Sequence, residues 1–174
     1  MVVEKKTEEN PLESARLIQM LQTLTKEESK SFARFLASPY HNTTEAILKF
    51  YQVLVNYYPS FQPNDLTKGE IYKQVFDRDY DENQMNQLMT KTCRALENFF
   101  AVEGLKKDEL LTTKLKRDAF QKRKLSKQYT KANKQLQNLL EKEGHPKSST
   151  YLERFLLNDN ILYHSNPGPN GNQV

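Results

Sequence analysis

The sequence predicts an all-α protein, and three observations carry that prediction. Helix-start signals recur along the 174-residue chain, apolar residues repeat at intervals of three and four, and sustained period-two alternation is absent. In the commonest signal, a Ser, Thr, Asp or Asn precedes a Glu or Gln by three residues, so that each side chain bonds an unpaired amide at the helix start. It appears at Thr25/Glu28, Asn42/Glu45, Thr67/Glu70, Asp81/Gln84 and Thr150/Glu153.

These signals, with the stops that follow them, define the helices in order. The expected helices span residues 11–23, 26–37, 44–57, 68–76, 82–103, 107–143 and 150–163. Asn10-Pro11 begins the first, because the missing N–H of proline costs nothing at the first helical position. Ser38-Pro39 ends the second, since the residue before proline avoids the helical region, and Pro59 follows the third. Gly104 and Gly144 are expected to be left-handed C-caps of the fifth and sixth.

The order of these elements predicts a multi-helix domain, of about five helices, followed by a long amphipathic basic helix and an antiparallel partner helix. Residues 1–10 are expected to form a flexible N-terminus, and 11–105 the helical domain, with a helix-turn-helix-like unit at 68–103. Residues 106–164 are expected to form the long helix hairpin. Residues 165–174 have no apolar anchor, which predicts a disordered tail.

Composition argues against several classes of function. The single cysteine, Cys93, rules out an intramolecular disulfide and a Cys-based metal cage, and no two histidines have the i, i+4 spacing of a zinc site. Five glycines form no glycine-rich phosphate-binding loop. The chain has neither an apolar leader segment at its start nor an apolar run of membrane-spanning length. We therefore expect a cytoplasmic protein that is not an enzyme, with no cofactor, metal, membrane or small-molecule substrate.

Positive charge is concentrated in residues 106–134. This segment holds eleven Lys or Arg and three acids, a net charge of +8, whereas residues 1–105 carry −3 and residues 135–174 carry −1. The total of +4 therefore hides one strongly basic element, and such elements attract anionic partners.

Helical phasing of residues 107–143 predicts one basic face opposite one apolar face. The apolar face contains Leu111, Leu115, Leu125, Tyr129, Ala132, Leu136, Leu139 and Leu140. The candidate partner-binding residues on the basic face are Lys116, Arg117, Phe120, Arg123, Lys124, Lys127, Lys131 and Lys134. Phe120 lies among these charges, where a partner side chain could pack on it or a base could stack.

The plain interpretation of such a face is that it is exposed to solvent. Solvent-exposed helix faces usually combine positive and negative side chains, however, whereas here like charges repel at Arg123/Lys127 and Lys127/Lys131. We therefore expect a non-catalytic interaction module whose basic helix face docks an acidic partner, either an acidic protein surface or a second copy of the chain. The alternative is sequence-nonspecific nucleic-acid binding through the same face. Base-specific recognition by the unit at 68–103 is disfavoured, because Asp77, Asp79, Asp81 and Glu82 crowd its turn.

Four strings occur in order along the chain: SPYHN (38–42), YYP (57–59), LTKGEIYKQVF (66–76) and ALENFF (95–100). Together they resemble an uncharacterised family of bacterial all-helical proteins. In that family these segments form an N-terminal helical domain, followed by a longer array of helix pairs. The resemblance covers roughly residues 14–163 and implies a fold without implying an activity. It also implies a short or truncated member of the family.

Overall fold

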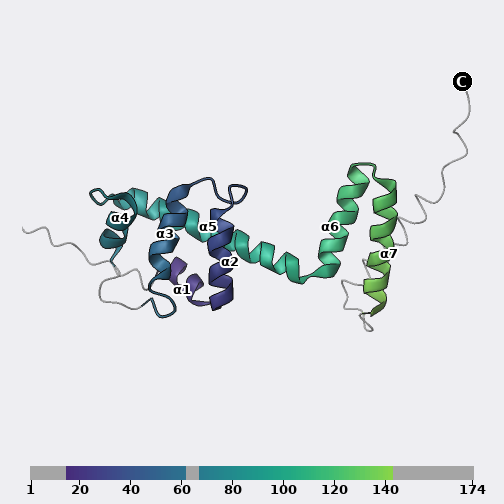
Figure 1. Cartoon of the computed structure of the whole chain (residues 1–174), viewed down its shortest axis with the longest axis horizontal. Helices are drawn as coiled ribbons and strands as arrows, with labels where there is room; N and C mark the ends of the chain where they lie inside the picture. Colours follow the sequence, from purple (N-terminus) through teal and green to yellow (C-terminus); the bar gives the residue numbers. More distant parts are fainter. Residues whose placement is uncertain (1–14, 62–66, 143–174) are drawn as a thin grey trace, which may run out of the picture. The chain divides into compact units, whose positions relative to one another are not determined.

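The computed structural model describes residues 15–61 and 67–142, and helices are the only regular elements in these two ranges (Figure 1). The all-α prediction is therefore confirmed. The helices are α1 (Arg16–Gln22), α2 (Lys26–Ala37), α3 (Glu45–Val55), α4 (Lys68–Phe76), α5 (Glu82–Lys107), α6 (Glu109–Lys122) and α7 (Ser126–Lys142). The chain divides into two compact units, residues 1–102 and residues 103–174, which are described separately below.

Three of the predicted helix starts have the expected bond from the first residue's side chain, and the reciprocal bond forms at α2 alone among them. At α2 the Thr25 side chain accepts a hydrogen bond from the Glu28 amide at 3.1 Å, and the Glu28 carboxylate accepts one from the Thr25 amide at 3.0 Å. The Thr67 hydroxyl accepts from the Glu70 amide at 3.3 Å, and the Asp81 carboxylate accepts from the amide of Gln84 at 3.0 Å. Each bond satisfies an amide that the helix itself leaves unpaired.

The start of α3 differs from the expected one. Its N-cap is Thr44, which makes no side-chain capping bond. Asn42 instead accepts a hydrogen bond from the Thr44 amide and donates one to the Leu36 carbonyl, each at 2.9 Å. The Asn42 amide therefore ties the loop to the end of α2, because its side chain reaches both segments.

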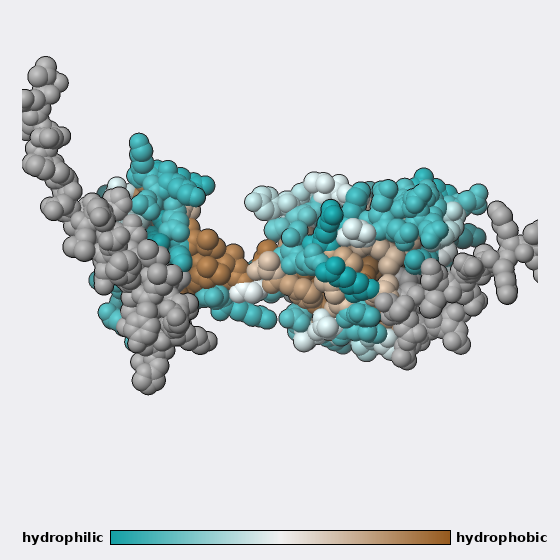
Figure 2. All heavy atoms as spheres, turned by 180° about the vertical axis from the view of Figure 1, so that it is seen from behind, coloured by the Kyte–Doolittle hydropathy of each residue, from teal (hydrophilic) through white to brown (hydrophobic). Residues whose placement is uncertain are grey.

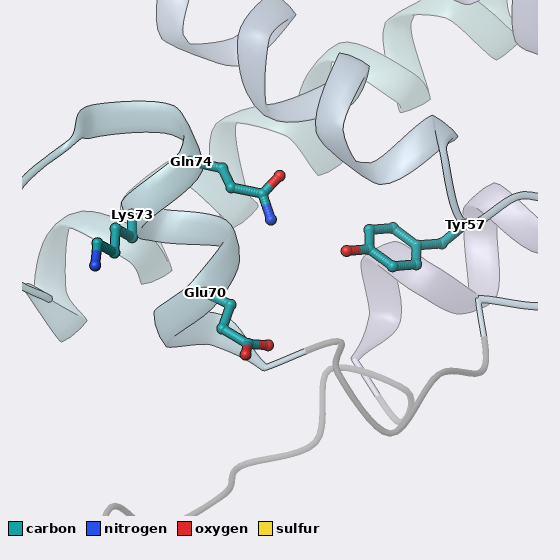
Figure 3. Close-up of a pocket in the computed structure, with 4 residues that line it drawn as sticks. All are labelled: Tyr57, Glu70, Lys73 and Gln74. Atoms are coloured by element: carbon teal, nitrogen blue, oxygen red, sulfur yellow. The ribbon is translucent and has the colours of Figure 1, made fainter.

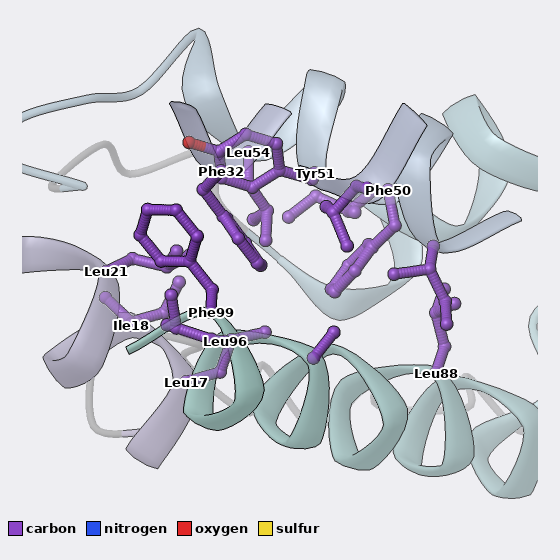
Figure 4. Close-up of a cluster of buried hydrophobic side chains, with 14 of the residues drawn as sticks. Leu17, Ile18, Leu21, Phe32, Phe50, Tyr51, Leu54, Leu88, Leu96 and Phe99 are labelled. Carbon is purple, nitrogen blue, oxygen red and sulfur yellow. The ribbon is translucent and has the colours of Figure 1, made fainter. Parts of the chain in front are cut away.

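The core of the first unit takes side chains from all five helices, α1 to α5, and Figure 4 shows a part of it. Leu17, Ile18 and Leu21 of α1 are almost completely buried, as are Leu96 and Phe99 of α5. A second set of buried side chains comes from α2 and α3: Phe32, Phe50, Tyr51 and Leu54. Burial of this much apolar surface is the main stabilising contribution to the unit.

Aromatic rings link three of these helices. The Phe32 ring lies 5.3 Å from the Phe99 ring and 4.8 Å from the Tyr51 ring, centroid to centroid, with the latter pair edge to face. The Tyr51 hydroxyl donates to the Ser29 carbonyl at 2.9 Å and lies 2.7 Å from the Ser29 hydroxyl. Burial raises the pKa of the Tyr51 phenol, and the hydrogen bond with the Ser29 side chain offsets part of that effect.

Gly104 is not the C-cap that its position predicts, because α5 continues to Lys107. A Cβ at Gly104 would meet nothing within 4 Å, so glycine fills no steric requirement there. The helix ends at Lys107 instead. The carboxylate of the next residue, Asp108, accepts a hydrogen bond from the Leu111 amide at 2.8 Å and caps the start of α6.

The second unit contains the largest departure from the sequence prediction. The single helix expected over residues 107–143 is two helices, α6 and α7, which pack against each other as a hairpin (Figure 1). Lys124 adopts a left-handed conformation, with φ of 57°. The Lys124 amide donates to the Gln121 carbonyl and the Leu125 amide to the Phe120 carbonyl, each at 3.0 Å. This pair of bonds is a Schellman termination, which usually has glycine where Lys124 lies.

The hairpin buries a narrow seam. Leu136 and Leu140 of α7 are buried against Leu110 of α6, and Ala132 of α7 and Thr113 of α6 are also buried. Near the open end, the Gln135 amide donates to the Glu109 carboxylate at 3.2 Å. The hairpin thus forms within residues 109–142, whereas the antiparallel partner was expected at 150–163.

The helix predicted at residues 150–163 lies outside the described residues. So do the expected start at Asn10-Pro11, the flexible N-terminus at 1–10, the cap at Gly144 and the disordered tail at 165–174.

Candidate functional site

The hairpin distributes the eight predicted binding residues over two helices and a turn. Six of them are exposed: Lys116, Arg123, Lys124, Lys127, Lys131 and Lys134. Arg117 is buried and Phe120 is half-buried. The predicted single stripe therefore does not form, because it required one uninterrupted helix.

Arg117 points into the second unit instead of toward solvent. Its side chain is only 9% exposed, and both its Nε and Nη2 donate to one Asp118 carboxylate oxygen, at 2.9 and 2.7 Å. A buried guanidinium paired with a carboxylate has its charge largely neutralised. Arg117 is consequently unavailable to an external anion.

Two leucines of α6 that were expected in the buried seam are exposed instead. Leu111 and Leu115 are 42% and 49% exposed. Hydrophobic surface is visible among the hydrophilic regions in the space-filling view (Figure 2). The turn at Lys124 explains the error, since the side of α6 that faces α7 is set by the hairpin and not by the phase of one long helix.

On α7 the predicted phase holds. Lys127, Lys131 and Lys134 are exposed, and at 100° per residue they lie opposite Ala132, Leu136 and Leu140, which are buried. We call Lys127, Lys131 and Lys134 the basic row. It spans roughly 10 Å along the helix at 1.5 Å per residue.

A second basic group lies at the tip of the hairpin and consists of Lys122, Arg123 and Lys124, which we call the basic turn. All three are exposed. Arg123 Nη1 donates to the Ala119 carbonyl at 3.1 Å, so this cation also caps the end of α6. Leu125 follows and is 39% exposed, which places an apolar side chain between the basic turn and the basic row.

Electrostatic repulsion within these two groups is not offset by neighbouring acids. Residues 119–140 contain six Lys or Arg and no Asp or Glu. Within residues 15–61 and 67–142, none of the three lysines of the basic row and neither Lys122 nor Lys124 forms an ion pair. Lys127 and Lys131 repel at i, i+4, and Lys127 lies in the first turn of α7, where the helix dipole disfavours a cation. The arrangement favours binding of an anion from outside the hairpin.

The first unit has an open hollow of about 440 Å³ lined by Tyr57, Glu70, Lys73 and Gln74 (Figure 3). The Tyr57 hydroxyl and the Gln74 amide point toward one another, whereas Lys73 points away. The Glu70 carboxylate accepts a hydrogen bond from the Thr67 hydroxyl at 3.1 Å, so it serves the start of α4. Among these four lining side chains there is no nucleophile paired with a general base.

The helix-turn-helix-like unit has a polar outer face. Asn83, Asn86, Gln87, Thr90, Lys91 and Arg94 are all exposed on α5. The turn before α5 is acidic, and the Asp81 carboxylate is occupied in capping the helix. Negative charge at this end opposes the approach of a phosphate backbone.

Neither Cys93 nor His41 is placed for catalysis. Burial raises the pKa of the half-buried Cys93 thiol. The charge of Arg16 lowers this pKa and the charge of Glu97 raises it, and both effects are smaller than that of burial. A thiol whose pKa is raised is a poorer nucleophile at neutral pH. The His41 ring stacks on the Phe35 ring at 4.1 Å, centroid to centroid, and thus serves the loop before α3.

The described residues contain no group of three or more His, Cys, Asp or Glu that could hold a metal ion. Among those same residues, no helix is both long enough and apolar enough to cross a membrane. Comparison with family models, with curated proteins and with solved structures gives no match to the chain.

Proposed function

We propose that the protein is a non-catalytic interaction module whose α6–α7 hairpin docks an acidic protein surface. The observation that carries the proposal is the basic row, three exposed lysines on the side of α7 opposite its buried face, in a 22-residue stretch without a single acid. The contact residues are Lys127, Lys131 and Lys134, with Lys122, Arg123 and Lys124 at the tip. Arg117 and Phe120 are no longer part of the proposed surface.

A protein partner is favoured over nucleic acid by the apolar neighbour of the basic row. The basic row alone, about 10 Å long, reaches roughly three phosphates at ~3.4 Å each, and the basic turn adds three further cations to the surface. Stacking on bases needs an exposed aromatic ring, whereas Phe120 is half-buried and the exposed apolar residue beside the row is Leu125. An aliphatic side chain surrounded by charge is typical of a protein–protein contact.

The test compares two probes that carry the same charge. Affinity of the protein for a peptide of about ten glutamates and for a single-stranded oligonucleotide of about ten phosphates is measured from roughly 50 to 300 mM salt. We expect the peptide to bind more tightly, with affinity that falls as salt increases. Tighter binding of the oligonucleotide would support nucleic-acid binding instead, and absence of binding to either probe at low salt would contradict both functions.

A further inference from the structure

The turn between α4 and α5 is a concentrated source of negative charge in the first unit. Residues 77–82 contain Asp77, Asp79, Asp81 and Glu82 against one cation, Arg78, for a net charge of −3. All six residues of this segment, which we call the acidic turn, are exposed.

Arg78 does not pair with the acids beside it. Its Nη2 donates to the Gln84 side-chain carbonyl, and its guanidinium lies 4.9 Å from the Phe76 ring centroid and 6.0 Å from that of Tyr72. Within the described ranges, none of the four acids takes part in an ion pair. The acidic turn therefore carries negative charge that the first unit leaves unneutralised.

The acidic turn also has an exposed apolar centre. Tyr80, between Asp79 and Asp81, is 46% exposed. Its ring packs edge to face on Tyr72 at 5.5 Å, so it is held in place. Burial raises the pKa of the Tyr80 phenol, and the charges of Glu82 and Asp81 raise it further, as expected in a negative environment.

The basic surface of the hairpin has the same layout with the opposite sign. Leu125, 39% exposed, lies between the cations of the basic turn and Lys127 of the basic row. Interfaces concentrate their binding energy in such an apolar centre surrounded by polar groups.

We infer that the acidic partner of the hairpin is the acidic turn of a second copy of this chain. The inference rests on the proposed function and specifies its partner. Lys127 and Lys131 would pair with Asp79 and Glu82, and Leu125 would pack against Tyr80. Each copy carries both halves of the contact, so this heterologous association is not limited to two copies and gives short chains of molecules.

The test is sedimentation of the whole protein from roughly 20 to 500 µM in about 50 mM salt, a range suited to a small charged interface. We expect the average mass of the wild type to rise with concentration beyond that of a dimer. Two double variants, Asp79→Lys/Glu82→Lys and Lys127→Glu/Lys131→Glu, should each remain monomeric. A control, Lys91→Glu/Arg94→Glu, has the same number of charge reversals on the exposed face of α5 and should associate like the wild type.

Mixing the two monomeric variants gives the decisive result. The intact basic row of one variant meets the intact acidic turn of the other, and the two reversed surfaces are also opposite in charge, so the mixture should associate although neither variant does so alone. A wild type that stays monomeric, or a mixture that does not pair, would overturn the inference. Binding of the polyglutamate peptide distinguishes failure of the self-association inference from failure of the proposed function. If the proposed function holds, Asp79→Lys/Glu82→Lys should keep peptide binding and Lys127→Glu/Lys131→Glu should lose it.

Discussion

The hydroxyl of Tyr51 makes the stability of the first unit depend on pH. Its folded-state pKa is raised above the ordinary value of 10.0, mainly by burial. The protonated phenol therefore contributes stability that is fully present below about pH 10 and is lost as pH rises further. The protonated phenol also donates the hydrogen bond to the Ser29 carbonyl, which the ionised form cannot make.

Replacement of the hydroxyl tests this account. We expect Tyr51→Phe to lower the free energy of unfolding by about 1 kcal/mol at pH 7, the usual contribution of such hydrogen bonds. Because the variant has no phenol to ionise at this position, the difference from wild type should shrink as pH rises from about 9 to 11. Chemical denaturation at several pH values measures the free energy of unfolding of both proteins. A difference between them that stays constant with pH would contradict the account.

Lys124 is a second position where one residue determines local structure. Its φ of 57° is left-handed, a conformation that costs a residue with a Cβ roughly 1 kcal/mol relative to glycine. Lys124→Gly should therefore raise the stability of the hairpin by up to about 1 kcal/mol. Lys124→Ala removes the same charge but keeps a Cβ in the left-handed conformation. It should therefore not raise the midpoint temperature of thermal unfolding. Equal effects of the two substitutions would show that charge, and not conformation, is the cause.

At the scale of elements, the hairpin depends on a small apolar seam. Leu136 is 1% exposed against α6, whereas Leu115 on the outward face of α6 is 49% exposed. Leu136→Ala should cost about 2–4 kcal/mol through lost burial and the cavity it leaves. Leu115→Ala should change stability by about 0.5 kcal/mol or less. Helicity measured through urea denaturation compares the two, and a similar loss in both would contradict the assigned packing.

The sequence predicts those elements whose signals are local. The bonds of Thr25 with Glu28 involve residues three apart, and the phase of Lys127, Lys131 and Lys134 against Leu136 extends over only a few turns, so both are correct. The turn at Lys124 has no glycine or proline that would predict it from the sequence. It results from the packing of α6 on α7, which is a tertiary effect.

Part of the candidate site was predicted wrongly because the sequence does not show the turn at Lys124. Arg117 and Leu115 exchange their expected environments, because the break at Lys124 removes the single helix whose phase had assigned them. Lys116 keeps its exposure, but it lies on α6 and outside the basic row. What remains is a shorter basic surface than the sequence predicts, confined to α7 and the hairpin tip.

At the scale of the whole molecule, charge is divided between the two units. The acidic turn carries −3 in residues 77–82, and residues 119–140 carry six basic side chains without an acid. Such a division gives one chain both an anionic and a cationic contact surface, and it makes any association through them sensitive to salt.

The most direct measurement for the proposed function is the affinity of the polyglutamate peptide for two variants of equal net charge. Lys127→Glu/Lys131→Glu/Lys134→Glu reverses the basic row, and Lys30→Glu/Lys91→Glu/Arg94→Glu reverses three exposed cations on α2 and α5. If the basic row is the docking surface, its reversal should weaken binding at low salt by about tenfold or more, and the control should weaken it far less. Equal losses in the two variants would show that the peptide senses only net charge and would contradict a docking site on α7.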